Sequence, residues 1–490
     1  LHKGAVIKLE LKQTSFGDKK KAEFERNKLF THENILSQFK NGKNGRAVPA
    51  GLARKETWQM FLEDSDIGRQ TIQTDWREIH AEGYYPGTFR ESEGCLIPKG
   101  NAKTRCKAVR MINKLCPAGK AFTSMLWKRS NTKKKDFAFG FTARRRREQA
   151  MLIANTTKWR LRQIGISHIQ SMHDVANAFP SMGHKALEDM IDRTCKDEDG
   201  PFIKARHKHS IMCVPTPQGE RLYLQPGQGG LQGDSAMASE FGQVYEDNVE
   251  GWTKNRHGQI IAEDPITKEK LHIGTTMYAD DISDINIVTE QTYVAITEDR
   301  NSELDEILNS MEMAQNKDKE EHLVCMMGNG SVKDSQSMFQ YSKLRRSTTK
   351  DFGMMKTSGK YLGNISQTNG KTNLNVDNRI NAMRDAYYAL QKFWTRRDVK
   401  LRTKGTAFKG LVLSAGLSGM EAETATTSEL KKIDTETMRL ARKVMAGRAC
   451  TSDSDDSKKA LKNEWVRKKL GVYTTESELS KRRVKWYKKC

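Results

Sequence analysis

Two adjacent acidic residues between two short strand-forming runs constrain this 490-residue chain more than any other feature. Asp280 and Asp281 stand in the sequence Met-Tyr-Ala-Asp-Asp-Ile, after the run 275–278 and before the run 285–288, and both runs favour strands. Neighbouring residues of a regular strand point to opposite faces, so both carboxylates can reach one centre only at a tight turn. The pattern therefore predicts a β-hairpin with a pair of carboxylates at its tip.

A third acidic residue, Asp174, follows a partly apolar stretch well upstream of this pair. Magnesium is a hard cation that prefers carboxylate, carbonyl and phosphate oxygens as ligands. Two such ions about 4 Å apart can activate a 3′-hydroxyl and neutralise a leaving pyrophosphate in an in-line displacement. Holding them requires carboxylates from separate segments. An Asp-Asp pair alone is more often an ordinary loop, so the hypothesis of a metal site depends on the combination with Asp174.

The charge of the chain indicates a polyanionic partner. It has 84 Lys and Arg residues against 61 Asp and Glu residues, a formal net charge of +23. A surplus of this size repels itself unless polyanions neutralise it, so nucleic acid is the expected partner. Two basic runs, 133–135 and 144–147, are candidate phosphate contacts, although either could equally be a solvated face. The longest weakly apolar stretch, 410–420, is too short to span a bilayer, so we expect no membrane association.

The eight cysteines are scattered and form no Cys-x-x-Cys pair. This usage favours reduced thiols in an intracellular protein over a disulfide framework or a zinc site. No signal-peptide pattern is visible. The first residue is Leu1 rather than Met, so we expect a fragment or a processed product.

Hydrophobic periodicity predicts several helices. In the stretch 302–315, apolar residues recur at i, i+3, i+4 and i+7, and Ser302 is a plausible N-terminal cap. The same reasoning predicts helices over 184–195 and 236–252, and residues 55–64 also have a helical pattern.

The residues 278–281, Tyr-Ala-Asp-Asp, resemble the Y-A-D-D box of reverse transcriptases, in particular those of non-LTR (LINE-type) retrotransposons. Other segments resemble further boxes of that family, in the family's order: 95–99 (L-I-P-K), 109–112 (R-P-I), 139–141 (G-F), 174–179 (D-x-x-x-A-F), 229–234 (Q-G-D), 316–319 (N-x-x-K) and 360–363 (Y-L-G). The stretch from 376, with Gly419-Met420-Glu421, resembles the family's thumb. The resemblance covers residues 90–450. Departures at Met111, Ala138 and Pro180 leave all three acids intact and place the sequence on a divergent branch.

The resemblance implies an α+β fold of the right-hand polymerase type, with fingers, a palm built on an antiparallel sheet and a helical thumb. It implies fingers and palm over 91–365 and a thumb over 366–450. The remaining parts would be an N-terminal extension over 1–90, with a candidate role in RNA or template binding, and a charged C-terminal tail over 451–490. Asp174 and the Asp280-Asp281 turn would then lie at neighbouring strand ends.

The resemblance also implies roles for individual residues. The two Mg²⁺ ions, or Mn²⁺ in their place, would be held by Asp174, Asp280 and Asp281, and Lys319 would be the general acid that protonates pyrophosphate. The incoming nucleotide would be bound by Lys99, Arg110, Val175, Phe179, Gln232 and Gly233. Phe179 would block a ribose 2′-hydroxyl, although it could also be a plain core residue, and Tyr361, Leu362 and Gly363 would grip the primer end. Asp234 and Asp284 are expected to be non-catalytic.

We therefore expect an RNA-directed DNA polymerase of a LINE-like element, with an RNA template, a DNA primer or target and deoxynucleotides as partners. Its expected location is the nucleus and cytoplasm. No endonuclease pattern is visible, so a nuclease either was lost with the rest of the protein or is supplied separately. Two alternatives stay open. One is a group II intron maturase or telomerase-like polymerase, and the other is a catalytically silent polymerase fold kept as an RNA-binding scaffold subunit.

Overall fold

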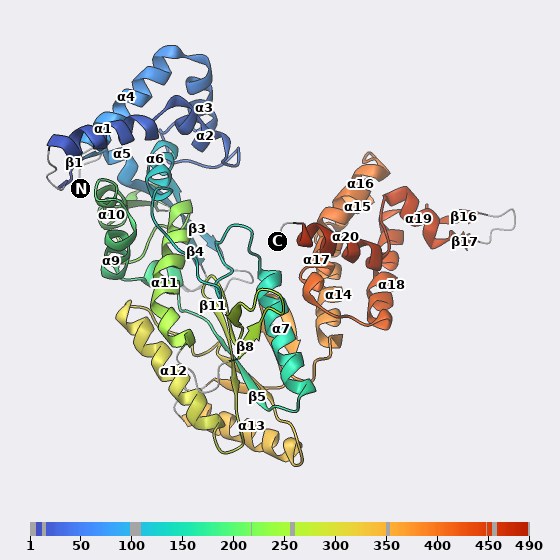
Figure 1. The fold of residues 1–490 in the computed structure, drawn as a ribbon. Coiled ribbons are helices and arrows are strands. Elements are labelled where there is room, and N and C mark those ends of the chain that lie inside the picture. The colour runs from blue at the N-terminus through green and yellow to red at the C-terminus, as the bar shows by residue number, and fades with distance from the viewer. Residues whose placement is uncertain are drawn as a thin grey trace. The chain divides into compact units, whose positions relative to one another are not determined.

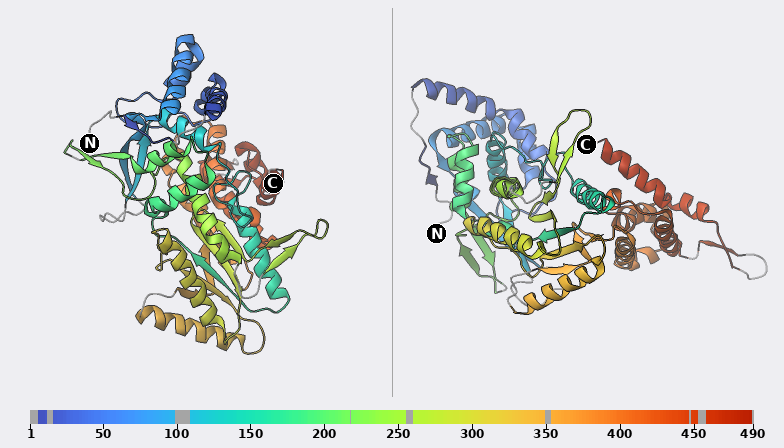
Figure 2. Two further views of the ribbon diagram at one scale, coloured as in Figure 1. Left: turned by 60° about the vertical axis from the view of Figure 1, so that its left-hand side comes forward. Right: turned by 60° about the horizontal axis from the view of Figure 1, so that its bottom comes forward.

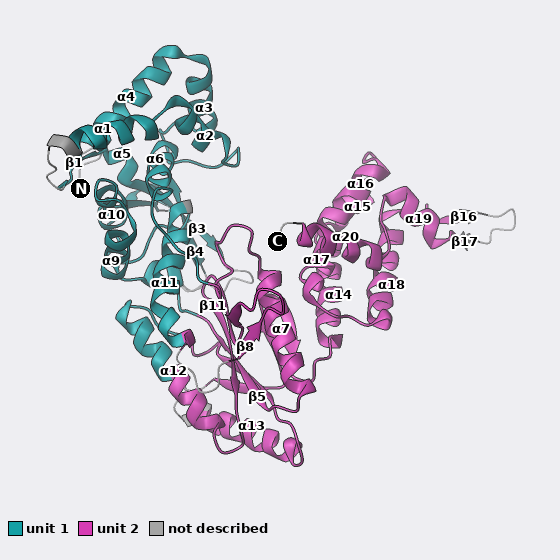
Figure 3. Cartoon of the chain, in the orientation of Figure 1, with its two compact units in different colours: residues 1–135, 175–252, 302–315 teal, residues 136–174, 253–301, 316–490 magenta. Residues whose placement is uncertain are grey.

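The computed structural model describes residues 6–11, 16–98, 109–216, 218–254, 260–348, 353–446, 448–452 and 458–488. The chain divides into two compact units, each assembled from separate stretches of sequence (Figure 3). Unit 1 comprises residues 1–135, 175–252 and 302–315, and unit 2 comprises 136–174, 253–301 and 316–490. Both units mix helices with small sheets, so the fold class is α/β mixed.

Unit 1 is mostly helical. Its elements are β1 (Ile7–Lys8), α1 (Phe16–Leu29), α2 (His32–Lys40), α3 (Lys55–Asp64), α4 (Asp66–Glu82), β2 (Tyr84–Tyr85), α5 (Gly87–Arg90), β3 (Glu91–Pro98), β4 (Val109–Leu115), α6 (Pro117–Trp127), α8 (Ala178–Ser181), α9 (His184–Thr194), α10 (Gly200–Lys208), β6 (Ile211–Pro215), β7 (Arg221–Leu224) and most of α11 (Ser235–Lys254). Aromatic rings from α4, α6 and α10 pack together with Phe30, which directly follows α1. Phe30 stacks on Phe122 with ring centroids 5.5 Å apart, and Trp76 and Phe202 meet Phe122 edge-on. Residues 16–82 therefore share a core with 117–127 and 200–208.

The strands β4, β3, β6 and β7 form a four-stranded sheet in that order within unit 1. The β3–β4 and β6–β7 pairs are antiparallel, and β3 and β6 run parallel. Arg110 lies on β4 opposite Ile97, and its side chain is exposed.

Unit 2 is built on a five-stranded sheet. Its elements before residue 370 are α7 (Arg147–Gln163), β5 (His168–His173), β8 (Ile261–Glu263), β9 (Lys270–His272), β10 (Thr275–Tyr278), β11 (Asp281–Ile287), the first half of α12 (Tyr293–Ser310), β12 (Glu321–Cys325), α13 (Ser331–Thr348), β13 (Met354–Lys356), β14 (Ser358–Tyr361) and β15 (Asn364–Gln367). The sheet order is β10-β11-β5-β12-β13. All neighbours are antiparallel except β12 and β13, which run parallel, so the expected antiparallel sheet has one parallel edge pair.

The alternation of side chains along the strands assigns each face of this sheet to different helices. Met172 and Leu323 pack with Met151 and Leu161 of α7, whereas their neighbours Ile169 and Val324 pack against α12 and α13. The ribbon views show α7 on one side of the sheet and α13 on the other (Figures 1 and 2).

The rest of unit 2 is a helical cluster with a single core. It contains α14 (Asn373–Tyr388), α15 (Gln391–Thr395), α16 (Leu401–Ala407), the π-helix η2 (Phe408–Leu413), α17 (Ser414–Gly416), the 3-10 turn η3 (Met420–Ala422), α18 (Thr427–Val444), β16 (Cys450–Ser452), β17 (Lys458–Ala460), α19 (Asn463–Leu470) and α20 (Thr475–Tyr487). Val466 and Leu479, in the stretch expected to be a charged tail, are buried with Trp394 and Phe408 in the same core. The expected domain boundaries stay predictions.

Local sequence signals explain several helix ends. Thr426 and Glu429 form a reciprocal capping box at the start of α18, and Ser65 caps α4, which ends at Gly83 in the left-handed conformation. The helices predicted over 184–195 and 236–252 are confirmed as α9 and α11. The helix predicted over 302–315 was wrong in its bounds. It begins at Tyr293, so Ser302 lies inside the helix and does not cap it.

No helix in the described ranges is long and apolar enough to cross a membrane. The six cysteines whose placement is described carry free thiols.

Candidate active site

The hairpin predicted around Asp280 and Asp281 is formed by β10 and β11. Tyr278 pairs directly with Asp281, so only Ala279 and Asp280 occupy the turn. Ala279 has a φ of +59°, in the left-handed region that non-glycine residues seldom adopt. The second strand begins at Asp281, earlier than the 285 expected from the sequence, because a two-residue turn needs no further linker.

Asp174 lies beside this hairpin because β5 pairs with β11. In the antiparallel register His173 is opposite Ile282, so Asp174, directly after β5, is next to the start of β11. The prediction that the three acids lie at neighbouring strand ends is confirmed.

The three carboxylates interact electrostatically. Burial, together with the negative charges of Asp280 and Asp174, raises the pKa of Asp281 to about 7, although Lys319 acts in the opposite direction. A carboxyl group whose pKa is raised close to 7 by neighbouring negative charges is typical of functional sites.

Asp174 is held by residues of the segment 316–319. The Lys319 ammonium lies 2.9 Å from Oδ2 of Asp174, and the side-chain amide of Asn316 donates to the same oxygen at 3.0 Å. The backbone amide of Asn316 also donates to the carbonyl of Asp174 at 2.7 Å. Asn316 was not among the predicted site residues, although its place three residues before Lys319 could have indicated it.

A buried polar network lies directly after Lys319. Glu320 is 1% exposed, and its Oε1 is 3.1 Å from Nε2 of His322 and 4.0 Å from Nδ1 of His173. Burial opposes ionisation of Glu320, but the hydrogen bond from His322 and the interactions with His322, His173 and Lys317 outweigh it and lower the pKa to about 2. The network anchors both His173, before Asp174, and the end of the Lys319 loop.

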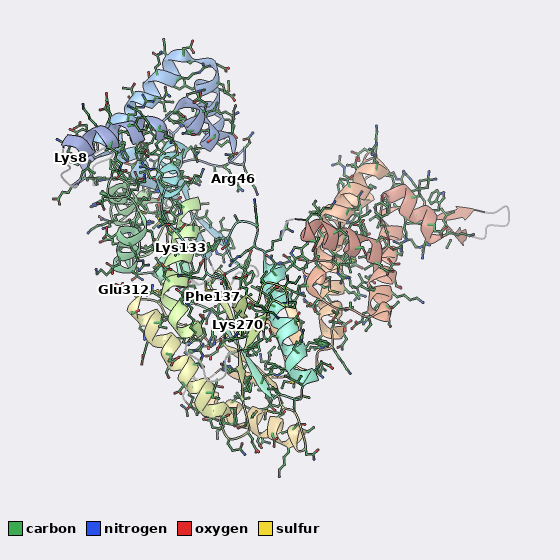
Figure 4. All side chains as sticks on the ribbon, viewed as in Figure 1. Lys8, Arg46, Lys133, Phe137, Lys270 and Glu312 are labelled. Carbon is green, nitrogen blue, oxygen red and sulfur yellow. The ribbon has the colours of Figure 1, made fainter. Side chains whose placement is uncertain are left out.

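The segment around the G-F box, 139–141, lies along the other edge of the hairpin, a contact that the sequence did not predict. The amide of Phe139 donates to the carbonyl of Met277 at 2.8 Å, and the amide of Met277 donates to the carbonyl of Phe137 at 2.7 Å (Phe137 is labelled in Figure 4). A Cβ on Gly140 would overlap with the backbone nitrogen of Ala279 and lie 2.9 Å from its Cα. Only glycine therefore allows this close approach to the acidic turn.

Of the predicted primer-grip residues, Tyr361 is buried and the other two form a turn. The hydroxyl of Tyr361 lies 2.8 Å from Oγ1 of Thr276, and burial raises the pKa of this phenol. Leu362 and Gly363 connect β14 to β15 with φ values of +48° and +87°. Their carbonyls accept hydrogen bonds from Arg147 and Arg379, respectively, so two guanidinium groups hold the turn.

The other predicted nucleotide-binding residues that the structure describes belong to unit 1. Val175 is buried and forms an isolated bridge with Gln315. Phe179, on α8, is partly exposed, and its ring centroid lies 4.8 Å from that of Phe241. Lys99 lies outside the described residues.

Gln232 and Gly233 contact β4 of the same unit. The carbonyl of Gln232 accepts a hydrogen bond from the amide of Asn113 at 2.6 Å. Gly233 has a φ of +122°, and a Cβ there would overlap with the carbonyl oxygen of Asn113. The glycine is thus required by the fold of unit 1 itself.

The acids expected to be non-catalytic have buried partners. Asp234 lies 2.6 Å from the Arg206 guanidinium. Asp284 accepts a hydrogen bond from Thr275 at 2.9 Å and lies 3.2 Å from Arg300.

The oxygen donors of Asp174, Asp280 and Asp281 match the ligand chemistry of Mg²⁺, and their mutual repulsion would be relieved by a cation. Within the part of the chain that the structure describes, no group of three or more His, Cys, Asp or Glu side chains is already arranged to enclose a metal ion. The Lys319 ammonium forms an ion pair with Asp174 at 2.9 Å. The donor set fits a hard divalent cation, and a bound ion would compete with Lys319 for Asp174.

No protein-family model matches this chain, and no curated protein sequence matches it. Similar solved structures include apo telomerase from Candida tropicalis truncated from its C-terminal domain, at 12% identity and a TM-score of 0.36 over 57% of this chain and 54% of that chain. Telomerase from Candida albicans in complex with a TWJ fragment of telomeric RNA is 13% identical, with a TM-score of 0.36 over 80% of this chain and 64% of that chain. The chain thus spans about half to two thirds of the length of these two telomerases.

Proposed function

We propose that this chain is an RNA-directed DNA polymerase of the LINE-type retroelement kind. The observation that carries the proposal is the meeting of Asp174 with the Asp280-Asp281 turn across the β5–β11 pair. The raised pKa of Asp281 supports it, since clustered carboxylates destabilise a fold and are retained where chemistry needs them. The ordered sequence boxes around these acids supply the reaction class.

In this proposal Asp174, Asp280 and Asp281 hold Mg²⁺. When bound, two ions would lower the pKa of a primer 3′-hydroxyl and stabilise the negative charge that develops on the transferred phosphoryl group. Lys319 then has two tasks. It neutralises Asp174 in the resting protein, and it donates a proton to the leaving pyrophosphate once a substrate draws it away.

Residues outside the acidic cluster would position the substrates. Arg147 and Arg379 hold the turn of Leu362 and Gly363, which would support the primer end through its backbone. In unit 1, Lys99 and Arg110 would bind the triphosphate, and Phe179 would exclude a 2′-hydroxyl.

The proposed layout follows the right-hand polymerases. The five-stranded sheet would be the palm, the four-stranded sheet and its helices would belong to the fingers, and the helical cluster after residue 370 would be the thumb. An RNA template, a DNA primer and deoxynucleotides would be its partners, with a separate endonuclease. Its proposed location is the nucleus and the cytoplasm.

Primer extension tests the proposal. The full chain is incubated with Mg²⁺, an RNA template and a labelled DNA primer, with deoxynucleotides or ribonucleotides. We expect DNA product from the wild type and none from the Asp280→Asn/Asp281→Asn variant. A control with the same loss of charge, Asp75→Asn/Glu464→Gln, changes two exposed acids and is expected to remain active.

Each outcome has a distinct meaning. Equal use of ribonucleotides would contradict the role of Phe179. Product that repeats a short template segment would favour the telomerase-like alternative over the LINE type. A folded protein that binds RNA tightly but extends no primer would favour the silent scaffold.

A further inference from the structure

A cavity of about 350 Å³ lies within unit 2, away from the acidic cluster. It is enclosed by the C-terminal half of α7, by β15 with the residues that follow it, and by residues 422–424. Its lining includes three basic residues and one indole, Lys158, Arg162, Lys371 and Trp159.

The position of this cavity separates it from the candidate active site. Arg162 also lines a second cavity of about 400 Å³, together with Cys325 of β12. Cys325 pairs with His168, at the start of β5, whereas Asp174 follows the end of that strand. A six-residue strand spans roughly 20 Å, so Arg162 and the carboxylates are at opposite ends of the sheet.

The α7 residues in the lining share one face of their helix. Asn155, Trp159 and Arg162 follow one another at i, i+4 and i+7. The adjoining stripe, with Ala154 and Leu161, is buried against the sheet. The face toward the cavity is thus polar and aromatic. Packing of the core does not require polar or aromatic side chains at these positions.

The basic side chains of the cavity, Lys158 and Arg162, could contact a bound anion. Lys158 is only 6% exposed, and its ammonium donates to the hydroxyl of Ser366. Burial lowers the pKa of Lys158 to about 8, although the negative charge of Glu423 acts to raise it. The Arg162 side chain makes no hydrogen bond or ion pair with any residue in the described stretches. Glu423 also lines the cavity, where it accepts hydrogen bonds from Asn364 and Asn375 and its charge acts on Lys158.

The indole of Trp159 is 55% exposed at the rim of the cavity. Exposed aromatic rings next to cations are stacking platforms for unpaired bases, and base stacking on such a ring contributes typically about tenfold or more in affinity. A guanidinium matches phosphate oxygens in a bidentate manner.

We propose that this cavity binds a nucleoside phosphate of single-stranded RNA, with the base on Trp159 and the phosphate on Arg162 and Lys371. This is a second RNA contact beyond the template path of the proposed polymerase. A free mononucleotide offers the same base and phosphate as a nucleotide of an RNA strand. The competition experiment below distinguishes these two ligands.

Photo-crosslinking tests the site without requiring catalysis. A 12-nucleotide RNA containing 4-thiouridine is irradiated with the full chain in the absence of deoxynucleotides, and crosslinked peptides are mapped by mass spectrometry. We expect crosslinks in the peptide that carries Trp159. Arg162→Glu and Trp159→Ala should each reduce them by about tenfold while crosslinks elsewhere persist. Arg160→Glu, on the same helix but outside the lining, should leave them unchanged.

Competition identifies the source of the ligand. Displacement by unlabelled RNA but not by AMP or inorganic phosphate supports a strand, whereas displacement by AMP at similar concentration assigns the site to a mononucleotide. Absence of crosslinks from this peptide, or equal crosslinking in both variants, would overturn the proposal, as would stronger displacement by a phosphopeptide. Because the assay is independent of DNA synthesis, it can fail while primer extension succeeds, and the reverse.

Discussion

At the scale of single residues, the candidate site combines two carboxyl groups with opposite electrostatic environments. Partial burial and the charges of the neighbouring acids raise the pKa of Asp281 to about 7. Glu320 is more deeply buried, but His322 and Lys317 stabilise its charge and lower its pKa to about 2. The first group weakens the fold at neutral pH and the second strengthens it. This contrast separates a candidate catalytic acid from a supporting one.

The raised pKa of Asp281 predicts a pH-dependent stability. The folded protein binds a proton that the unfolded chain releases near pH 4, so this contribution is present at low pH and is lost as the pH rises through 7. Asp281→Asn should therefore stabilise the metal-free protein at pH 8 by roughly 4 kcal/mol, and have little effect at pH 4. Urea unfolding at both pH values measures the difference. Asp75→Asn, at an exposed position, is the control, and a gain that does not depend on pH would contradict the prediction.

The lowered pKa of Glu320 predicts the opposite dependence. Its contribution to stability is present above pH 4.5 and is lost as the pH falls through 2. Between these limits the wild type should lose roughly 3 kcal/mol more than Glu320→Gln. Acid titration of the unfolding free energy tests this, with exposed Glu464→Gln for comparison. Parallel curves for wild type and Glu320→Gln would show that the buried network is not charged as described.

At the scale of elements, the acidic hairpin depends on three neighbours for its position. β5 pairs with β11, the segment around Phe139 pairs with β10, and Tyr361 bonds to Thr276 beneath the turn. Each neighbour comes from a different part of the sequence. The turn is therefore held by long-range contacts on all of its described sides, which is how a strained backbone such as that of Ala279 can be maintained.

Gly140 is the most sensitive point of this arrangement. Gly140→Ala should displace the turn and reduce both stability, by about 1–3 kcal/mol, and any polymerase activity. Gly410→Ala is the matched control, because nothing lies within 4 Å of its added Cβ and alanine favours a helix. Thermal unfolding and primer extension measure both effects. A Gly140→Ala variant as stable and active as Gly410→Ala would refute the close approach.

At the scale of the whole molecule, the dominant property is the net charge of +23. The helices after residue 460 are rich in Lys and Arg, whereas Lys134 and Lys135 of the run 133–135 are paired with Glu246 and Glu250. Charge of this kind acts on association with polyanions and not on the choice of fold.

We expect RNA affinity to depend strongly on salt. If six phosphates of a single strand are contacted, affinity should fall about 300-fold between 50 and 200 mM monovalent salt, and by more with further contacts. Fluorescence anisotropy with a labelled single-stranded RNA measures the slope. An affinity that hardly changes over this range would show that the net charge is not engaged with phosphates.

Local patterns predicted a large part of the secondary structure. The helices α9 and α11 were predicted from periodicity, and the acidic hairpin from the strand-forming runs on both sides of the Asp-Asp pair, because these signals lie within one stripe or one turn of the chain. The bounds of α12 were missed because its first turns have a different polar pattern from its second half, which alone carries the clear apolar stripe. The presence of all three acids was likewise visible in the sequence.

The sequence by itself determined which residues can carry the chemistry, and the tertiary structure decided which of them meet. The register of β5 on β11 places Asp174 next to the turn. The segment 316–319, which precedes β12, places Asn316 and Lys319 at the carboxylate of Asp174. The need for Gly140, the Glu320 network and the cavity beside Trp159 also became visible only in three dimensions. The physical reason is the separation in sequence of the residues involved. Periodicity and turn chemistry are properties of neighbouring residues. These contacts join residues far apart in the sequence, and the packing of the whole unit brings them together.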